Sequence, residues 1–412
     1  MVQRIHSPNG IEAWLVEDYA VPIVAVDFAF RGGAAQDPPE RPGLGQMMTS
    51  LLDEGAGPLD DQAFQLRIEE NAVELSFHAG RDYMAGSLRT LAGGRAEAFD
   101  LTRLAVTVPR FDPDPVERIR QGMLANLRRE ASDPHSIASR AFTAALYPGH
   151  PYGSWPHGTL ESIGAASREE IAVHHARLFA RDNLVVSIVG AITAADAAAM
   201  LDTVFAALPA RAGLSPVAEV APAVATDRRL IDLDVPQTVL QLATPGVKRS
   251  DPDYMAAYIA NHILGGGSFS SRLFQKVREE KGLAYSVSTQ LACFQHSAYV
   301  AGGVATSNDR AAESLAIIEA EMAEMAAQGP TADELENAKS YITGSYALRF
   351  DTSAKIANQL THIQLEGLGS DYIERRNALV EAVTPEEVRA AGRRLFGEGK
   401  PFVTAVGRPE RL

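Results

Sequence analysis

The stretch GLGQMMTSLLDEGAG, residues 43–57, places polar side chains where a helix could present a metal site. Gln46 and Ser50 are four residues apart, so on a helix they lie on one face, with Thr49 beside them. An amide and a hydroxyl are poor metal ligands compared with imidazole or carboxylate, and a threonine hydroxyl is no general base near neutral pH. The spacing therefore fits a metal site, but the residues that would bind the metal are absent.

The apolar residues of the same stretch predict a helix that packs against a core. They recur at helical spacing, and Gly55 or Gly57 is expected to end the helix. The apolar stripe consists of Leu44, Met47, Met48, Leu51 and Leu52. Its two methionines are interpreted as core residues.

A second region, residues 261–290, concentrates glycines and charged residues. The pattern predicts two helices joined at the glycine run, the second ending at Gly282, and then a strand. No strand leads into the glycines and no G-K-[ST] follows them, so a turn between helices is favoured over a phosphate site. By pattern alone, Arg278 fits a solvated helix face and Tyr285 fits a core strand.

The chain is built from two halves that share a plan. SREEIAVHHARLF at 167–179 is echoed by TPEEVRAAGRRLF at 384–396, an offset of 217 residues. Each copy begins with Ser or Thr followed three residues later by Glu, which predicts a reciprocal cap at the start of a helix. Earlier in each half a turn ends in Asp-Pro, at Asp37 and Asp251. An internal duplication explains these matches.

Residues 208–227, rich in Ala and Pro and without a hydrophobic period, are interpreted as the linker between the halves. The expected domains are residues 1–207, with the degenerate helix, and residues 228–412, with the Arg/Tyr pair. In each half, strand patterns interleave with long helical stretches. The predicted fold class is α+β, with two homologous domains that each consist of a mainly antiparallel sheet covered by helices.

Several motifs, in order along the chain, resemble one family. They are GLGQMMTSLLDEGAG, ERIRQGMLANLRREASDP, YPGHPYG and LGGGSFSSRLFQKVREEKGLAYSV. With the duplication, they are similar to the pitrilysin or insulinase-type metallopeptidases, the inverted zincins, and in particular to short two-domain members that work as paired subunits. The resemblance covers about residues 7–408 and implies a fold like that of the mitochondrial processing peptidase.

Members of that family that cut peptides carry H-x-x-E-H on the first helix and a more distant Glu. The two His and the distant Glu bind Zn²⁺, and the Glu between the His residues acts as general base. The resemblance places the first His at Gln46, the base at Thr49, the second His at Ser50 and the distant Glu at Asn126. All four are replaced, so the resemblance implies that this chain holds no zinc.

The remaining histidines form no replacement cluster in the sequence. His174 and His175 are adjacent, and neighbours on a helix point apart. His150 and His157 are expected in the loop after the helix that carries Asn126, in turn or structural roles.

The second half keeps another part of the family's site. The resemblance implies that Arg278 and Tyr285, seven residues apart, face a zinc site across a chamber. A tyrosine hydroxyl can donate to the oxyanion of a tetrahedral intermediate, and a guanidinium can hold a substrate carbonyl or the tyrosine itself. A chain with this pair but without zinc ligands resembles the non-catalytic subunit of a heterodimeric peptidase.

Composition and charge limit the classes of partner that the chain is expected to bind. With 412 residues, 46% hydrophobic and 22% charged, the chain has the composition of a globular protein of more than one domain. A formal charge of −14 and the lack of a basic stripe disfavour nucleic acid. Neither a membrane span nor a secretory signal is recognisable, so a cytoplasmic protein is expected, with the periplasm as the alternative for a processed chain. The single cysteine, Cys293, excludes an internal disulfide framework.

The leading hypothesis is a subunit that pairs with a zinc-bearing homologue, supplies Arg278 and Tyr285 to its zinc site, and encloses the peptide substrate. A homodimer is the alternative when that partner is absent. Two other functions stay open: a structural or assembly protein, like the respiratory-chain core proteins of this family, and a peptidase active alone. The substrate stays open between short unfolded peptides in general and a small precursor such as that of pyrroloquinoline quinone.

Overall fold

The computed structural model describes residues 2–224, 228–397 and 400–412. The chain divides into two compact units, each assembled from three segments. The first comprises Met1–Arg128, Ser154–Val217 and Ala347–Tyr372, and the second comprises Arg129–Gly153, Ala218–Tyr346 and Ile373–Leu412. Each unit thus takes most of its residues from one half of the sequence and a helical segment from the other half.

The domain boundaries expected from the sequence, 1–207 and 228–412, remain a proposal about how the duplication divided the chain. Within the predicted linker, residues 208–224 contain no helix or strand. The last linker residues, 225–227, lie outside the described residues.

The first unit is built on a six-stranded sheet with the order β1-β2-β6-β3-β5-β4. The strands are β1 (Gln3–His6), β2 (Glu12–Glu17), β3 (Ile23–Arg31), β4 (Glu74–Ala79), β5 (Tyr83–Leu91) and β6 (Leu184–Gly190). Neighbouring strands are antiparallel except β2 and β6, which are parallel.

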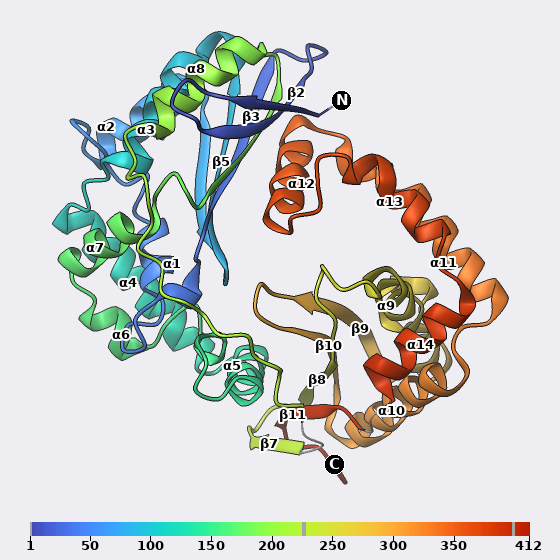
Figure 1. Ribbon diagram of the computed structural model, residues 1–412. Helices are drawn as coiled ribbons and strands as arrows, with labels where there is room; N and C mark the ends of the chain where they lie inside the picture. Colours follow the sequence, from blue (N-terminus) through green and yellow to red (C-terminus); the bar gives the residue numbers. More distant parts are fainter. Residues whose placement is uncertain (1, 225–227, 398–399) are drawn as a thin grey trace. The chain divides into compact units, whose positions relative to one another are not determined.

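The helices of the first unit lie on both faces of this sheet. They are α1 (Leu44–Thr49), α2 (Asp61–Glu70), α3 (Arg95–Thr107), α4 (Pro113–Glu130), α6 (Leu160–Ala165), α7 (Arg168–Leu178), α8 (Ala194–Phe205) and α12 (Ser353–Leu365). Helices α1, α3 and α8 contact the sheet over its main core, whereas α12 packs against β3 and β6 (Figure 1).

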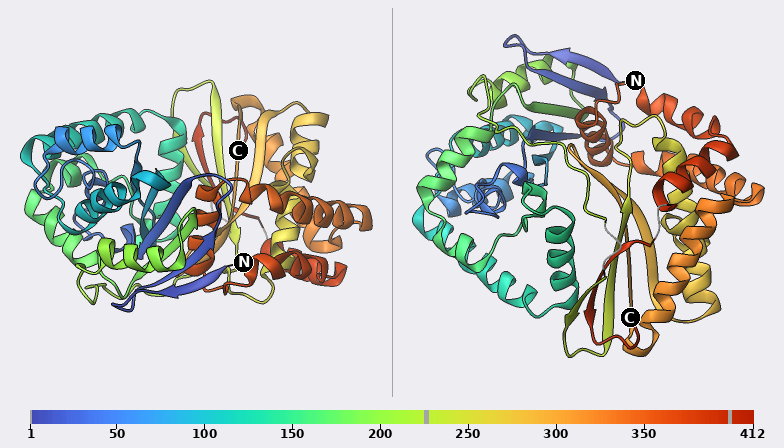
Figure 2. Two further views of the ribbon diagram at one scale, coloured as in Figure 1. Left: turned by 90° about the horizontal axis from the view of Figure 1, so that it is seen from above. Right: turned by 60° about the horizontal axis from the view of Figure 1, so that its bottom comes forward.

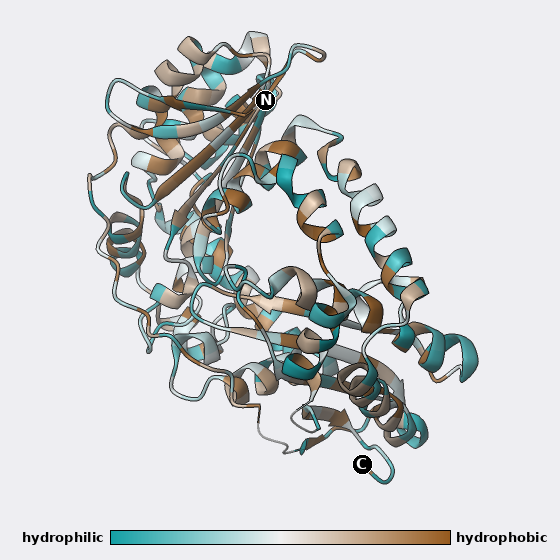
Figure 3. Ribbon diagram, turned by 45° about the vertical axis from the view of Figure 1, so that its right-hand side comes forward, coloured by the Kyte–Doolittle hydropathy of each residue, from teal (hydrophilic) through white to brown (hydrophobic). Residues whose placement is uncertain are grey.

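Alternation along β3 explains why the two faces differ. Successive side chains of a strand point to opposite faces. Phe28 and Phe30 belong to the main core. Asp27, the residue before Phe28, points to the opposite face, which α12 covers. In Figure 3 the strands of this sheet are largely brown, as expected for a sheet that is covered on both faces.

The second unit repeats this plan with five strands in the order β7-β11-β8-β10-β9. The strands are β7 (Arg228–Asp232), β8 (Gln237–Pro245), β9 (Ala284–Cys293), β10 (Ala298–Ser307) and β11 (Phe402–Gly407). This order matches β2-β6-β3-β5-β4 strand for strand, and β7 and β11 are parallel, as β2 and β6 are. The predicted α+β fold with two homologous sheets is confirmed.

The helices of the second unit also cover both faces of their sheet. They are α5 (Pro134–Leu146), α9 (Tyr254–Asn261), α10 (Ala311–Gln328), α11 (Ala332–Gly344), α13 (Tyr372–Glu381) and α14 (Pro385–Phe396). Helices α10 and α14 contact β10 and β8 over the core, and α5 packs on the other face, against β8 and β11 (Figure 2). Helices α5 and α12 therefore occupy matching places on the two sheets.

The predicted helix caps are present. Ser167 accepts a hydrogen bond from the backbone of Glu170, whose carboxylate accepts one from Ser167 N, and Thr384 and Glu387 do the same. These reciprocal bonds satisfy backbone amides that a helix leaves unpaired at its start. The duplicated helices α7 and α14 therefore begin in the same way.

Candidate functional site

The degenerate zinc helix is α1, and it is shorter than predicted. The α-helix ends at Thr49, and the chain continues in tighter turns, with Leu51 N bonded to Met48 O at 3.1 Å, before Gly55 reverses it with φ 103°. The hydroxyl of Ser50 donates to Gln46 O at 2.9 Å, and that of Thr49 lies 3.1 Å from Gly45 O. Such bonds from side chain to backbone compete with helix continuation.

The apolar stripe of this segment is buried as predicted. Each of its five residues is at most 2% exposed, and all belong to the main core of the first unit: Leu44, Met47, Met48, Leu51 and Leu52. The segment therefore keeps its role as part of the scaffold.

The start of α1 is fixed by Asp37. Its carboxylate accepts hydrogen bonds from Gly43 N at 2.8 Å and Gly45 N at 2.9 Å, and Nε2 of His174 on α7 lies 3.1 Å from the same carboxylate. His175 instead has its Nε2 3.1 Å from Val106 O. The adjacent histidines therefore contact different groups, and His174 has a structural partner.

The residues at the zinc positions do not fit a zinc ion. The hydroxyls of Thr49 and Ser50 are engaged with helix carbonyls, and Gln46 offers only an amide. Asn126 lies on the exposed side of α4. Within the described ranges, no three His, Cys, Asp or Glu side chains gather closely enough to hold a metal ion.

Arg278 lies in a π-helical turn, Phe274–Glu280, of the second unit. Such turns are rare and are often found at functional sites. The guanidinium carbon of Arg278 is 4.8 Å from the ring centre of Phe274 and 4.6 Å from that of Tyr285. Both distances are within the range of cation–π attraction, so the arginine is held between two rings.

Tyr285 lies near the start of β9, an edge strand of the second sheet. Its side chain is 82% exposed, so the alternative of a core tyrosine is wrong. The sequence spacing of Arg278 and Tyr285 places them in contact, but Phe274 was not foreseen as the second ring.

The YPGHPYG motif is structural in the second unit. His150 lies with Nε2 3.0 Å from Ala218 O, and its Nδ1 accepts a hydrogen bond from Tyr152 N at 3.1 Å. The hydroxyl of Tyr147 is 2.9 Å from that of Ser297, and the rings of Tyr147 and Tyr152 meet edge to face. These contacts tie the segment after α5 to the β9–β10 hairpin.

One residue that the sequence analysis missed is Asp27. It is 8% exposed in the middle of β3, and burial raises the pKa of its carboxyl above the ordinary value. No lysine or arginine in the described part of the chain forms an ion pair with it. The available signal was a single charged residue inside the apolar run IVAVDFAF.

No helix in the described ranges combines the length and apolar character needed to cross a lipid bilayer. Residues 165–342 match the family model described as the peptidase M16 inactive domain. A non-peptidase homolog of Helicobacter pylori is 26% identical over 374 residues, which cover 90% of this chain and 86% of the relative. An uncharacterized zinc protease of Mycobacterium tuberculosis is 29% identical over 332 residues, covering 78% and 74%.

A solved structure gives the family directly. The peptidase M16 inactive domain from Pseudomonas fluorescens is 30% identical, with a TM-score of 0.93 and coverage of 100% of this chain and 98% of that one. The chain therefore belongs to the peptidase M16 family, as its resemblance to the pitrilysin-type metallopeptidases implied, and the proteins it is similar to include a non-peptidase homolog and an inactive domain.

Proposed function

We propose that this protein is the non-catalytic subunit of a two-subunit peptidase and that it supplies Arg278 and Tyr285 to the zinc site of a homologous partner. The partner's H-x-x-E-H would hold a zinc ion, and that ion would supply Lewis-acid activation of the peptide carbonyl and of water in the assembled pair. Peptides are the substrate class, enclosed between the two subunits.

The observation that carries the proposal is the exposure of Tyr285. A tyrosine that is 82% exposed contributes little to the core of its own unit. Among the strands that the structure describes, its strand β9 pairs with β10 alone, so the phenol stands at a sheet edge to which a second chain has access.

Arg278 orients the phenol rather than standing free in solvent. Its guanidinium lies against the Tyr285 ring and against the ring of Phe274, which is only 6% exposed. The buried ring of Phe274 fixes the arginine, and the arginine fixes the tyrosine. A hydroxyl held in this way can donate to the oxyanion that forms when water adds to the peptide carbonyl.

The test is peptide cleavage by the chain co-expressed with a zinc-bearing homologue from the same genome. Tyr285→Phe removes one hydroxyl, and kcat is expected to fall about 10²- to 10³-fold, the usual scale for one oxyanion donor. KM should change little, because the contact forms mainly in the transition state. Arg278→Ala is expected to lower kcat and also to raise KM.

Tyr341→Phe is the matched control. This tyrosine is also exposed in the second unit, at 60%, and its ring stacks on that of His262. It should leave kcat unchanged. Equal kcat for the Tyr285→Phe and wild-type pairs, with equal melting temperatures, would refute the catalytic role. Failure of the two chains to co-purify would instead favour the assembly-protein alternative, and cleavage by the isolated chain would favour a peptidase active alone.

A further inference from the structure

A row of small polar side chains crosses the first sheet on the face opposite its main core. The strand register aligns Ser187 on β6, Asp27 on β3, Ser87 on β5 and Ser76 on β4. Most of the core residues on the other face are apolar. Four polar residues in register on one face are therefore a local departure from the sheet's pattern.

Helix α12 covers two of these four residues with polar groups. The hydroxyl of Thr361 lies 3.0 Å from that of Ser187 and 3.1 Å from Asp27 O, and Gln364 Nε2 donates to the Ser187 hydroxyl at 2.8 Å. Asn358 Nδ2 is 3.3 Å from one carboxylate oxygen of Asp27. Burial raises the pKa of the Asp27 carboxyl, whereas a hydrogen bond from the Thr361 side chain and the His362 imidazole, both on α12, act to lower it.

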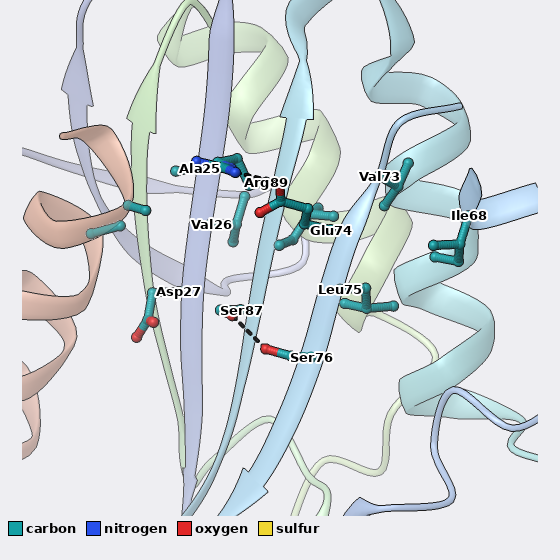
Figure 4. Close-up of a pocket in the computed structure, with 13 residues that line it drawn as sticks. Ala25, Val26, Asp27, Ile68, Val73, Glu74, Leu75, Ser76, Ser87 and Arg89 are labelled. Carbon is teal, nitrogen blue, oxygen red and sulfur yellow. Dashed lines mark hydrogen bonds and ion pairs between the residues drawn. The ribbon is translucent and has the colours of Figure 1, made fainter. Parts of the chain in front are cut away.

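The other two residues of the row, Ser87 and Ser76, line a cavity. Figure 4 shows Asp27 directed toward the side of α12, with the Ser87 and Ser76 hydroxyls joined at 2.9 Å. Two cavities, of about 440 Å³ and about 560 Å³, share Asp27, Ser87 and Ala354 in their walls. Each has the size of an ordinary ligand pocket.

Asp27 is thus a buried carboxylate at the junction of two cavities, and the imidazoles of His362 and His78 are the ionisable groups that favour its charged form. An isolated ionised carboxylate in a protein interior is costly, and a cation that forms charge-assisted hydrogen bonds with it removes that cost. The net charge of −14 also attracts cations to the chain as a whole.

Three positively charged side chains line the cavities themselves, and each is paired with an acid or exposed: Arg89 lines the smaller cavity, and Arg349 and Lys355 line the larger. Arg89 pairs with Glu74, and Lys355 donates to Asp351 at 2.8 Å. Arg349 is exposed. In the described part of the chain, none of the three forms an ion pair with Asp27.

We propose that the cavity of about 560 Å³ is a subsite for the positively charged side chain of a lysine or arginine in an unfolded peptide. The ammonium or guanidinium group binds Asp27 and the Ser87 hydroxyl, and the aliphatic stem lies along Leu348 and Ala354. The proposal rests on the proposed function in one respect only, that the occupant is a peptide.

The test measures peptide binding to the isolated chain, without any zinc-bearing partner. The probes are fluorescently labelled unfolded peptides that differ at one central residue: lysine against norleucine, and arginine against citrulline. Norleucine keeps the four-carbon stem of lysine without the ammonium group, and citrulline keeps the length of arginine without the charge. Fluorescence polarisation is expected to show about tenfold tighter binding of the charged peptide, the scale of one charge-assisted hydrogen bond.

Asp27→Asn should bring the affinities of charged and neutral peptides together. Asp114→Asn, which removes an exposed acid on α4 of the same unit, should leave the tenfold preference intact. Ser87→Leu fills the cavity without changing charge and gives the same loss of preference, so the proposal stays testable even if Asp27→Asn misfolds.

Three results would overturn the subsite: equal affinity of the wild type for charged and neutral peptides, no binding of the lysine peptide, or a preference that survives Asp27→Asn. Butylamine serves as a free-amine probe. Binding of this amine that depends on Asp27 while the peptides show no preference would also overturn the peptide assignment. Arg278→Ala should keep the preference, so failure of the pair to cleave peptides and failure of this subsite are separate results.

Discussion

Helices α5 and α12 lie at matching places on the two duplicated sheets, but they are held there by different forces. Helix α5 docks through apolar side chains: Ala138 belongs to a cluster with Val239 and Val406, and the ring of Phe142 meets those of Tyr299 and Phe402 at 6.0 and 5.8 Å. Apart from a hydrogen bond from Gln241 Nε2 on β8 to the Ser139 hydroxyl at 2.7 Å, this contact is stabilised mainly by the hydrophobic effect.

Helix α12 docks through hydrogen bonds. Besides the bonds of Thr361 and Gln364 to the sheet, Arg31 donates to the carbonyls of Leu365 and Gln364 at 2.8 and 3.0 Å, at the end of the helix where a positive charge is favoured. The comparison teaches that the two copies share the place of the helix, whereas the first sheet makes more hydrogen bonds to its helix and has cavities beside it. A polar surface of this kind is suited to ligand binding, and an apolar one to permanent packing.

The largest expected effect is a loss of unfolding free energy when the apolar contact of α5 is disrupted. Phe142→Ala should cost about 3 to 5 kcal/mol of unfolding free energy, because the ring is 4% exposed and its removal leaves a cavity. Chemical denaturation followed by circular dichroism measures the loss. A cost below about 1 kcal/mol would mean that α5 is not held by this packing.

The next largest expected effect is a pH dependence of stability that arises from a buried histidine in the first unit. At the offset of 217 residues, His175 on α7 stands where α14 has Gly392. Burial lowers the pKa of His175 to about 4, so the folded chain keeps it neutral. An unfolded histidine, with a pKa near 6.5, takes up a proton first. Stability should therefore fall as the pH drops from about 6.5 to about 4, by up to about 1.4 kcal/mol per pH unit.

His175→Gln should flatten this dependence, because glutamine gains no proton. His135→Gln, at an exposed position on α5, is the control and should leave the slope unchanged. Melting temperatures between pH 7 and pH 4.5 decide the matter. An unchanged slope in His175→Gln would assign the acid sensitivity to other groups.

The smallest expected effect is the loss of unfolding free energy when one hydrogen-bonding group of α12 is removed. Thr361→Val keeps the shape of the side chain but removes the hydroxyl beside Ser187 and Asp27 O, at an expected cost of about 1 to 2 kcal/mol. Thr361→Ser keeps the hydroxyl and should cost less. If Thr361→Val costs as much as Phe142→Ala, the contrast between the two docking modes is wrong.

Local signals predicted local structure well. The capping boxes at Ser167 and Thr384 and the apolar stripe of α1 were readable because each depends on residues within a few positions of one another. The duplication was readable because its copies kept the same caps, and the matching strand orders confirm it.

Features that depend on distant residues were not predictable. Alternation along β3 decides the face on which Asp27 lies, but the cover of that face comes from α12, which follows by more than 300 residues and contacts Asp27 through Asn358. The π-helical turn around Arg278 has no signature in the sequence pattern, and neither does the ring of Phe274 beneath it. The catalytic role of Arg278 and Tyr285 stays a prediction, since geometry alone shows only that they touch.

The exchange of helical segments between the units has a consequence for synthesis on the ribosome. Strand β3 of the first unit is made at the start of the chain, but its partner helix α12 begins only at Ser353. The polar row on the first sheet therefore lacks its covering helix until most of the protein has been translated. The second sheet is synthesised after its covering helix, α5. The N-terminal unit is begun first and closed late, an order that makes it the unit most dependent on protection during folding.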